Sequence, residues 1–222
     1  MKKKILMLMT NVSETATDIK TGVWLEEFKV PYFMFLKEDY DVTVVSPDGG
    51  EIPIDPESMP ENPDEDDLKA VSALKDSEKL NQIDITEFDA LVVPGGHGAM
   101  FDLSGNTDVA KSLGLFCYEG KIVAAICHGV AALISVRTKE NRPFVEGKNL
   151  TGFSNEEEKQ TKYAKIIPFS LEDKLREEGA KYSCGKPFES YVTEDDNLIT
   201  GQNVQSVEEF TKAIITKINE LE

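Results

Sequence analysis

The sequence is poor in the residues that disulfide frameworks and metal sites require. Its 222 residues include only three cysteines and two histidines. So few thiols, in an odd number, do not make a disulfide framework, and we expect a reducing compartment and a cytoplasmic protein. Neither a CxxC nor an HExxH spacing is present, so no zinc site is predicted. The chain also lacks a P-loop and a dinucleotide fingerprint, so we expect no cofactor.

Basic residues are scarce as well. The chain has 24 lysines and arginines against 41 aspartates and glutamates, a formal net charge of -17. Phosphate contacts need a basic surface, so no nucleic acid is expected as a partner, and an anionic membrane is equally disfavoured. No apolar run is long enough to cross a bilayer, and residues 5–9 are too short an apolar run for a signal sequence. The charge favours a small neutral substrate.

Apolar runs of strand length alternate with amphipathic runs of helix length. This alternation predicts crossover connections and a doubly wound, mostly parallel sheet within one α/β domain over residues 1–222. The predicted strands cover residues 4–10, 41–46, 89–93, 121–126, 181–184 and 198–200. The predicted helices cover residues 23–37, 109–118, 170–178 and 207–221.

Residues 47–82 interrupt the alternation. They hold five prolines and the acidic run Asp64-Glu-Asp-Asp67, and a short helix over 68–80 is expected among them. We predict a small, proline-rich, acidic lobe inserted between the second and third strands. Two interpretations stay open: the lobe borders the functional site, or it is a solvated loop without a role.

The strongest functional signal lies around Cys127. One apolar run ends at Cys127, His128 and Gly129, and a second apolar run follows directly. The first run is typical of a buried parallel strand and the second of a helix packed on it, so Cys127 is expected at a sharp strand-to-helix turn. There the helix macrodipole would lower the pKa of the thiol and make it a nucleophile. The alternative is a small buried cysteine that only fills space.

Further groups are expected at the same edge of the sheet, because ligands bind beyond the carboxyl ends of parallel strands. In Pro94-Gly-Gly-His-Gly98, Gly95 and Gly96 would let backbone N–H groups point at developing negative charge, although an ordinary tight turn has the same pattern. His128 is placed to share or shuttle the proton of Cys127.

Carboxylates are candidates to complete this site. Glu26 and Glu27 lie on the helix after the first strand, and one of the three glutamates at 156–158 is a candidate to orient the histidine, although their spacing does not choose among them. Cys117, within a predicted helix, and Cys184, on a predicted short strand, are interpreted as structural.

In combination, these motifs resemble the DJ-1/PfpI superfamily, which has the class I glutamine-amidotransferase-like fold. The resemblance implies a flavodoxin-like sheet sandwiched by helices, and its finer details point to the heat-shock chaperone and glyoxalase III branch. The motifs that carry it are Glu27-x-x-x-Pro31, Pro94-Gly-Gly-His-Gly98, Ala125-Ile-Cys-His-Gly129 and Leu198-Ile-Thr-Gly-Gln-Asn203, with residues 21–27, 96–103 and 146–153 for the branch.

The resemblance assigns catalytic roles residue by residue. Cys127 takes the place of the family's nucleophilic, oxidation-prone cysteine, and His128 that of the histidine after it. Glu158, five residues after Phe153 of the Thr-Gly-Phe motif, matches the acidic third member of the triad. Glu27 matches the carboxylate that contacts the cysteine sulfur. Burial beside the thiol should raise the pKa of Glu27, whereas Glu158 should stay ionised.

A second group of residues is expected to meet the substrate. The backbone amides of Gly96 and His128 match the family's oxyanion-hole donors, and Gly95, His97 and Trp24 are predicted to complete this surface. Some larger relatives bind a metal through the counterpart of His97, another histidine and an acid. The matching helix of this chain has no histidine, so no metal is predicted.

These roles imply a cofactor-independent lyase of the glyoxalase III (D-lactate dehydratase) type. Such an enzyme converts methylglyoxal and water into lactate without glutathione, with a small dicarbonyl as substrate and a homodimer as the expected assembly. Two alternatives stay open. One is a holdase chaperone that binds unfolded clients under stress, and the other is a protein deglycase or redox stress protein that works through Cys127.

Overall fold

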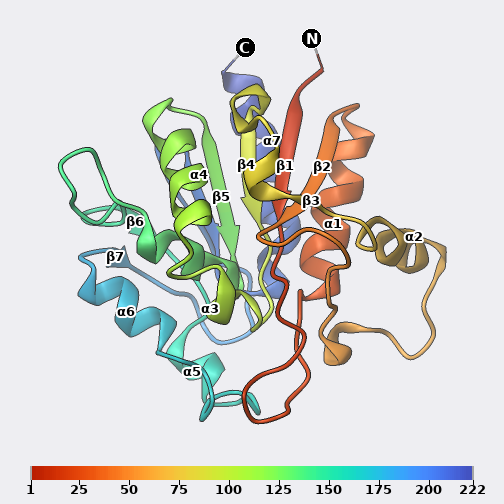
Figure 1. Ribbon diagram of the computed structural model, residues 1–222. Coiled ribbons are helices and arrows are strands. Elements are labelled where there is room, and N and C mark those ends of the chain that lie inside the picture. Colours follow the sequence, from red (N-terminus) through yellow and green to blue (C-terminus); the bar gives the residue numbers. More distant parts are fainter. Residues whose placement is uncertain (1, 222) are drawn as a thin grey trace.

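A computed structural model describes residues 2–221, with a seven-stranded sheet at its centre (Figure 1). The strands are β1 (Lys4–Leu8), β2 (Asp41–Ser46), β3 (Glu78–Lys79), β4 (Ala90–Val93), β5 (Ile122–Ile126), β6 (Asn149–Leu150), β7 (Lys181–Tyr182), β8 (Val192–Asp195) and β9 (Leu198–Gly201). The strand order is β3-β2-β1-β4-β5-β9-β8, and all neighbouring pairs are parallel except β8 with β9. β6 and β7 pair separately.

The middle of the sheet forms the core. Strands β4, β5 and β9 are buried at every position, and β1 is buried at every position after Lys4. Strands covered on both faces are continuous apolar runs, so their positions are predictable from the sequence alone. The predicted flavodoxin-like α/β fold, doubly wound and mostly parallel, is confirmed.

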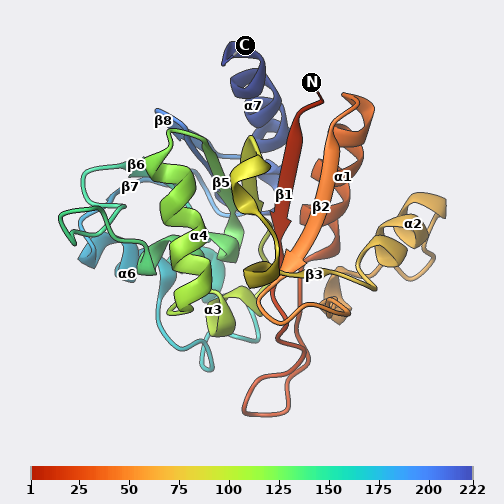
Figure 2. The ribbon, with the colours of Figure 1, turned by 45° about the horizontal axis from the view of Figure 1, so that its top comes forward.

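Helices cover both faces of the sheet (Figure 2). The α-helices are α1 (Leu25–Lys37), α2 (Glu65–Ala73), α3 (Ala99–Asp102), α4 (Thr107–Tyr118), α5 (Asn155–Glu158), α6 (Leu171–Glu177) and α7 (Val207–Glu220). The 3-10 helices are η1 (Pro56–Ser58), η2 (Leu80–Gln82), η3 (Ile85–Glu87), η4 (Cys127–Ser135) and η5 (Val204–Ser206). α1 packs on α7 at one face, and α4 packs on η4 at the other.

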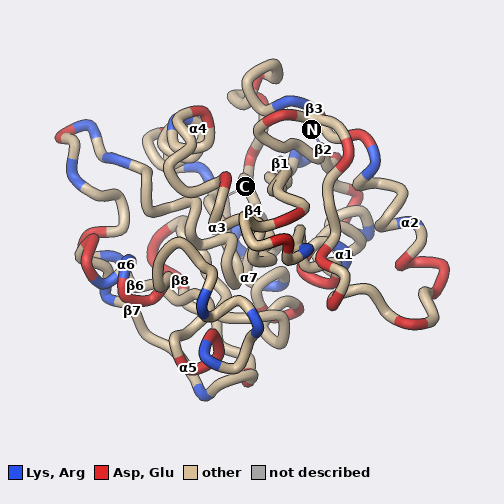
Figure 3. Tube along the Cα trace, turned by 60° about the horizontal axis from the view of Figure 1, so that its bottom comes forward, with Lys and Arg blue, Asp and Glu red and all other residues tan. Residues whose placement is uncertain are grey.

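The inserted lobe carries α2 beside α1, and Figure 3 shows acidic residues gathered around α2. The helix predicted over 68–80 is wrong at both ends, since α2 begins at Glu65 and ends at Ala73. The side chain of Asp64 accepts from the backbone N–H of Asp67, and the Asp67 side chain accepts from the N–H of Asp64. This capping box fixes the earlier start.

The turns that carry the candidate residues follow parallel strands at one edge of the sheet. Pro94-Gly-Gly-His-Gly98 follows β4, and Cys127 follows β5, which pairs directly with β4. This edge is where open parallel sheets bind ligands. Within residues 2–221, no helix has the length and apolar character needed to cross a membrane.

Candidate active site

Cys127 stands at a tight turn between strand and helix. β5 ends at Ile126, η4 begins at Cys127, and Cys127 has a φ of 57°. A non-glycine residue rarely adopts this left-handed conformation, and such strain is concentrated at functional sites. The residue is only 6% exposed. The expected turn is therefore present, with a 3-10 helix after it, but the thiol is more enclosed than the sequence suggested.

His128 connects the thiol to a carboxylate. Its Nδ1 lies 3.4 Å from Sγ of Cys127, and its Nε2 lies 2.7 Å from Oε2 of Glu158. Glu158 lies on α5, which begins after a capping box formed by Ser154 and Glu157. A carboxylate on Nε2 keeps the hydrogen there and leaves Nδ1 free to accept the thiol proton. The structure thus selects Glu158 from the run 156–158 as the group that orients His128.

Glu158 also binds a second histidine, a contact that the sequence did not predict. Nε2 of His97 lies 3.1 Å from Oε1 of Glu158, and the hydroxyl of Thr161 donates to the same oxygen at 2.7 Å. Burial alone would raise the pKa of Glu158, but the hydrogen bonds from His128 and His97 outweigh it and hold this pKa well below its usual value. Burial, with the charge of His128, lowers the pKa of His97 to about 4, so His97 is neutral at pH 7.

His97, His128 and Glu158 also raise the question of a metal, because their ligand atoms lie within 4.8 Å of one another. Zinc accepts two imidazoles and a carboxylate. The two imidazole rings lie with centroids 3.9 Å apart and planes tilted by 37°, and each Nε2 faces its own oxygen of Glu158. In this arrangement each Nε2 lies within hydrogen-bonding distance of its own oxygen of Glu158, which fits two N–H donors on one carboxylate. The same three side chains also lie close enough together to hold a metal ion.

Glu27, on α1, contacts the other side of the thiol. Its side chain is 1% exposed, is hydrogen-bonded to Cys127, and accepts the backbone N–H of Gly95 at 2.8 Å. Burial raises the pKa of Glu27 to about 7, against the opposing effect of these two hydrogen bonds. A Cβ at Gly95 would lie 2.6 Å from Oε2 of Glu27 and 2.8 Å from Cβ of Cys127, so only glycine permits this contact. The raised pKa agrees with the prediction from sequence.

The low thiol pKa predicted for Cys127 is wrong. Burial raises its pKa well above the usual range, the nearby Glu27 carboxylate raises it further, and only the backbone N–H of His128 acts in the other direction. The field of a helix end does not compensate for the loss of water. Cys127 and Glu27 are two acidic groups in contact, so the pair releases its second proton with difficulty. The thiolate must therefore form by proton transfer within the site.

The predicted substrate-binding residues separate into two groups. Gly96, with a φ of 102°, lines the same cavity as Cys127, and so do His97 and Trp24. Gly95 does not line this cavity, and its N–H is bound to Glu27. Gly95 therefore holds a catalytic candidate in place instead of offering its own amide to a ligand.

The cavity has a volume of about 370 Å³. Its reactive groups are Cys127, His128 and Glu27, and aromatic and polar side chains form the remaining wall. A mostly apolar cavity with a few convergent polar groups is the usual form of a small-molecule site. The aromatic residues that line it are Trp24, Phe153, Tyr163 and Phe188.

Tyr163 joins the inserted lobe to this site, a connection with no signal in the sequence. Its ring stacks on His97 with centroids 3.8 Å apart and planes 22° apart. Its hydroxyl lies 2.8 Å from Oδ2 of Asp55, which is completely buried, and Glu57 of the same lobe lines the cavity. Residues of the lobe therefore border the cavity, and a role for the lobe stays a prediction.

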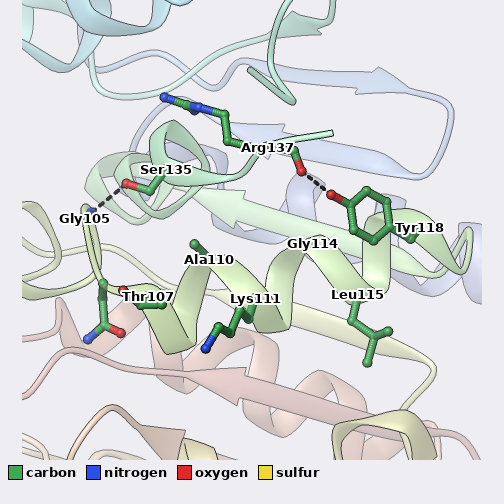
Figure 4. Close-up of a pocket in the computed structure, with 10 residues that line it drawn as sticks. Gly105, Thr107, Ala110, Lys111, Gly114, Leu115, Tyr118, Ser135 and Arg137 are labelled. Carbon is green, nitrogen blue, oxygen red and sulfur yellow. Dashed lines mark hydrogen bonds between the residues drawn. The ribbon is translucent and has the colours of Figure 1, made fainter. Parts of the chain in front are cut away.

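A larger cavity of about 560 Å³ lies along α4, away from Cys127 (Figure 4). Its polar groups are already paired: the Tyr118 hydroxyl donates to the carbonyl of Arg137, and the N–H of Gly105 donates to Oγ of Ser135 at 2.6 Å. The Arg137 guanidinium binds backbone carbonyls and Glu178. The amine of Lys111 also lines this cavity, but none of its lining residues is a cysteine, a histidine or an acidic residue, so the candidate site is the smaller cavity.

In a comparison with known families, residues 4–217 match the DJ-1/PfpI family. The chain belongs to the DJ-1/PfpI family. This DJ-1/PfpI protein is 30% identical to the glutathione-independent glyoxalase HSP31 of Saccharomyces cerevisiae, over 92% of this chain and 93% of that protein.

Two solved structures are similar to this chain over nearly its whole length. The crystal structure of glyoxalase III from Candida albicans matches with a TM-score of 0.87 and 25% identity, over 97% of each chain. The X-ray structure of the Rapid Encystment Protein 24 KDa from Francisella tularensis matches with a TM-score of 0.93 and 38% identity, over 97% of this chain and 99% of that one. Full-length relatives of this DJ-1/PfpI protein are thus named glutathione-independent glyoxalase and glyoxalase III.

Proposed function

We propose that this protein is a glutathione-independent glyoxalase of the glyoxalase III type, a lyase that converts methylglyoxal and water into lactate. One observation carries the proposal: Cys127 lies between His128 and Glu27 in a cavity suited to a small molecule. The names of the full-length relatives support the same activity. The steps that follow use only side chains and backbone groups of this chain, the substrate and water.

The first step is addition of the thiol to the aldehyde. The proton of Cys127 passes to Nδ1 of His128, which lies 3.4 Å from Sγ, and the sulfur forms a bond to the aldehyde carbon. The carbonyl π electrons move to oxygen. The backbone amides of Gly96 and His128 are the donors for this oxyanion. Enclosure in the cavity strengthens these charge interactions, because little water competes with them.

The second step moves a proton between two carbons. Glu27 removes the hydrogen from the carbon bound to sulfur, which gives an enediol, and returns a proton to the neighbouring carbon. The first carbon is oxidised and the second is reduced, so no external oxidant or reductant is required. A thioester of lactate remains on Cys127. A carboxyl whose pKa is about 7 suits both halves of this transfer.

The last step is hydrolysis. Water adds to the thioester carbon, the carbon–sulfur bond breaks, and lactate leaves. The Cys127 sulfur takes back a proton from His128, which restores the starting state. Glu158 binds Nε2 of His128 throughout and stabilises the positive charge that the ring carries between the first and last steps.

The test is lactate formation from methylglyoxal by the purified protein without glutathione. We expect turnover by the wild type and a loss of nearly all of it in Cys127→Ala, with circular dichroism and Tm close to wild type. Cys184→Ala is the matched control, because this cysteine is exposed and does not line the cavity. Equal turnover by Cys127→Ala and wild type would refute the mechanism.

A further inference from the structure

Phe188 has a conformation and an exposure that need an explanation. Its φ is 60°, its side chain is 43% exposed, and its ring lines the cavity that contains Cys127. A bulky side chain in the left-handed region is strained, whereas glycine or asparagine adopts that region readily. A half-exposed ring gains little from the hydrophobic effect to offset the strain. Glycine or asparagine would therefore fit this backbone conformation with less strain than phenylalanine.

The surrounding structure holds the backbone of Phe188 in place. Its N–H donates to Oε1 of Glu157 at 2.9 Å, and Glu157 is completely buried. Asn203 donates from Nδ2 to the same oxygen at 2.6 Å and to the carbonyl of Glu189 at 3.0 Å. Gln202 donates to the other oxygen of Glu157 at 2.9 Å. Strained residues persist where their surroundings over-determine them, and such residues cluster at ligand sites.

The size and lining of the cavity indicate what the ring is for. About 370 Å³ lies within the ~300–1,000 Å³ of typical small-molecule sites, and a three-carbon dicarbonyl fills only a small part of it. Phe188, Trp24 and Phe153 line this space. Polar side chains share the wall, namely Glu57, Gln160, Thr161, Lys162, Asn203 and Gln205. Aromatic walls favour an apolar or aromatic group, because ring contacts add to the burial of apolar area.

We propose that Phe188 determines substrate specificity, and that the cavity prefers 2-oxoaldehydes whose keto carbon carries an aromatic or extended apolar group. Phenylglyoxal represents this class. The assignment rests on the proposed glyoxalase activity for its chemistry, while the apolar subsite itself rests on Phe188 and the shape of the cavity. Such a substrate places its aldehyde carbon at Cys127 and its apolar group against Phe188.

Binding can be measured without any turnover. Trp24 is the only tryptophan in the chain and lines the cavity, so its fluorescence reports occupancy. Acetophenone and acetone are inert analogues of phenylglyoxal and methylglyoxal. We expect acetophenone to bind at least tenfold more tightly than acetone, and Phe188→Ala to remove most of that difference. Equal acetophenone affinity in wild type and Phe188→Ala overturns the subsite.

Kinetics and stability complete the test. In Phe188→Ala, kcat/KM should fall about tenfold more for phenylglyoxal than for methylglyoxal, and the extra loss should appear in KM. Phe188→Gly should show the same kinetic loss with an equal or higher Tm, because glycine relieves the strain. Leu68→Ala, at an exposed residue outside the cavity, is the matched control.

The possible failures are distinguishable. An equal loss for both substrates, or a lower Tm in Phe188→Gly, assigns Phe188 a structural role and overturns the specificity proposal. If Cys127→Ala keeps full turnover, the glyoxalase mechanism fails, and the fluorescence measurement still decides whether the apolar subsite exists.

Discussion

His97 and His128 lie with their ring centroids 3.9 Å apart, and they donate to the two oxygens of a single carboxylate, Glu158. The shared acceptor keeps the hydrogen of each ring on Nε2. Nδ1 of His128 is then the basic atom that faces the Cys127 thiol. The second histidine therefore helps to fix the proton distribution around the nucleophile, although it does not touch the sulfur.

Glu158→Gln should disturb this arrangement while preserving the shape of the side chain. An amide has one oxygen and one NH₂ group, so it cannot accept from both imidazoles, and one ring must move its hydrogen to Nδ1. We expect kcat/KM to fall by about 10- to 100-fold, less than the ~10²–10⁴-fold typical for loss of an acid–base group. The measurement is a pH profile of kcat/KM beside Glu156→Gln, an exposed neighbour. An unchanged profile would contradict the role of Glu158.

Glu27→Gln should separate stability from activity. The pKa of Glu27 is about 7 in the folded protein against 4.5 for an ordinary glutamate, so the folded state binds this proton more tightly than the unfolded state. Stability from this group is therefore present below pH 4.5 and is lost as the pH rises to 7, by about 3 kcal/mol. Glutamine does not titrate. We expect the variant to be more stable than wild type above pH 7 yet to lose turnover.

The check is the free energy of unfolding from urea denaturation at pH 5 and pH 8, for wild type and Glu27→Gln. The free energy of unfolding of Glu27→Gln minus that of wild type should be larger at pH 8 than at pH 5. The other titrating groups are common to both proteins, so they do not contribute to this change. Glu26→Gln is the control, because Glu26 is exposed on the same helix. A stability difference that does not depend on pH would show that Glu27 is ionised in the folded state throughout this range.

Gly95→Ala should force the Glu27 carboxyl and the Cys127 side chain apart. The new Cβ would lie 2.6 Å from Oε2 of Glu27 and 2.8 Å from Cβ of Cys127, both closer than real contacts allow. We expect kcat/KM to drop by at least tenfold and stability to fall by about 1–3 kcal/mol, as for other overpacked sites. Gly114→Ala is the control, because its Cβ would meet nothing closer than 3.7 Å and alanine favours the helix. Wild-type activity in Gly95→Ala would exclude close contact at Glu27.

Sequence reasoning succeeded where the signal was local. Strands β4 and β5 are continuous apolar runs, and the turn at Cys127 follows directly from the second of them. The elements that were not predicted from the sequence are short or partly polar, such as α3, α5 and β8. The thiol pKa was wrong because it depends on enclosure by α1 and on Glu27, which only the folded chain brings together.

Contacts between distant residues gave no signal either. Tyr163 reaches Asp55 across 108 positions of the chain, and neither residue belongs to a motif. Their hydrogen bond is visible only after folding, and so is the stacking of Tyr163 on His97.

This connection between lobe and site supplies the last prediction. The Tyr163 hydroxyl lies 2.8 Å from both the carboxyl of Asp55 and the carbonyl of Lys20, and it has one hydrogen to donate. A carboxylate is the stronger acceptor, so we expect the bond to go to Asp55. Asp55→Asn and Tyr163→Phe should each destabilise the fold, and a double-mutant cycle should give a coupling energy of about 1 kcal/mol or more.

Activity should respond to the ring of Tyr163 more than to its hydroxyl. Tyr163→Phe keeps the stacking on His97 and should retain kcat within a few-fold. Tyr163→Leu removes this stacking, so the His97 ring, which is hydrogen-bonded to Glu158, is held less firmly. We expect Tyr163→Leu to lower kcat by about tenfold and to shift the pH profile of kcat/KM, because the hydrogen bonds at Glu158 loosen. A purely structural role would lower Tm in both variants without moving the profile. Zero coupling in the cycle would instead assign the hydroxyl to Lys20 and leave the lobe without a link to catalysis.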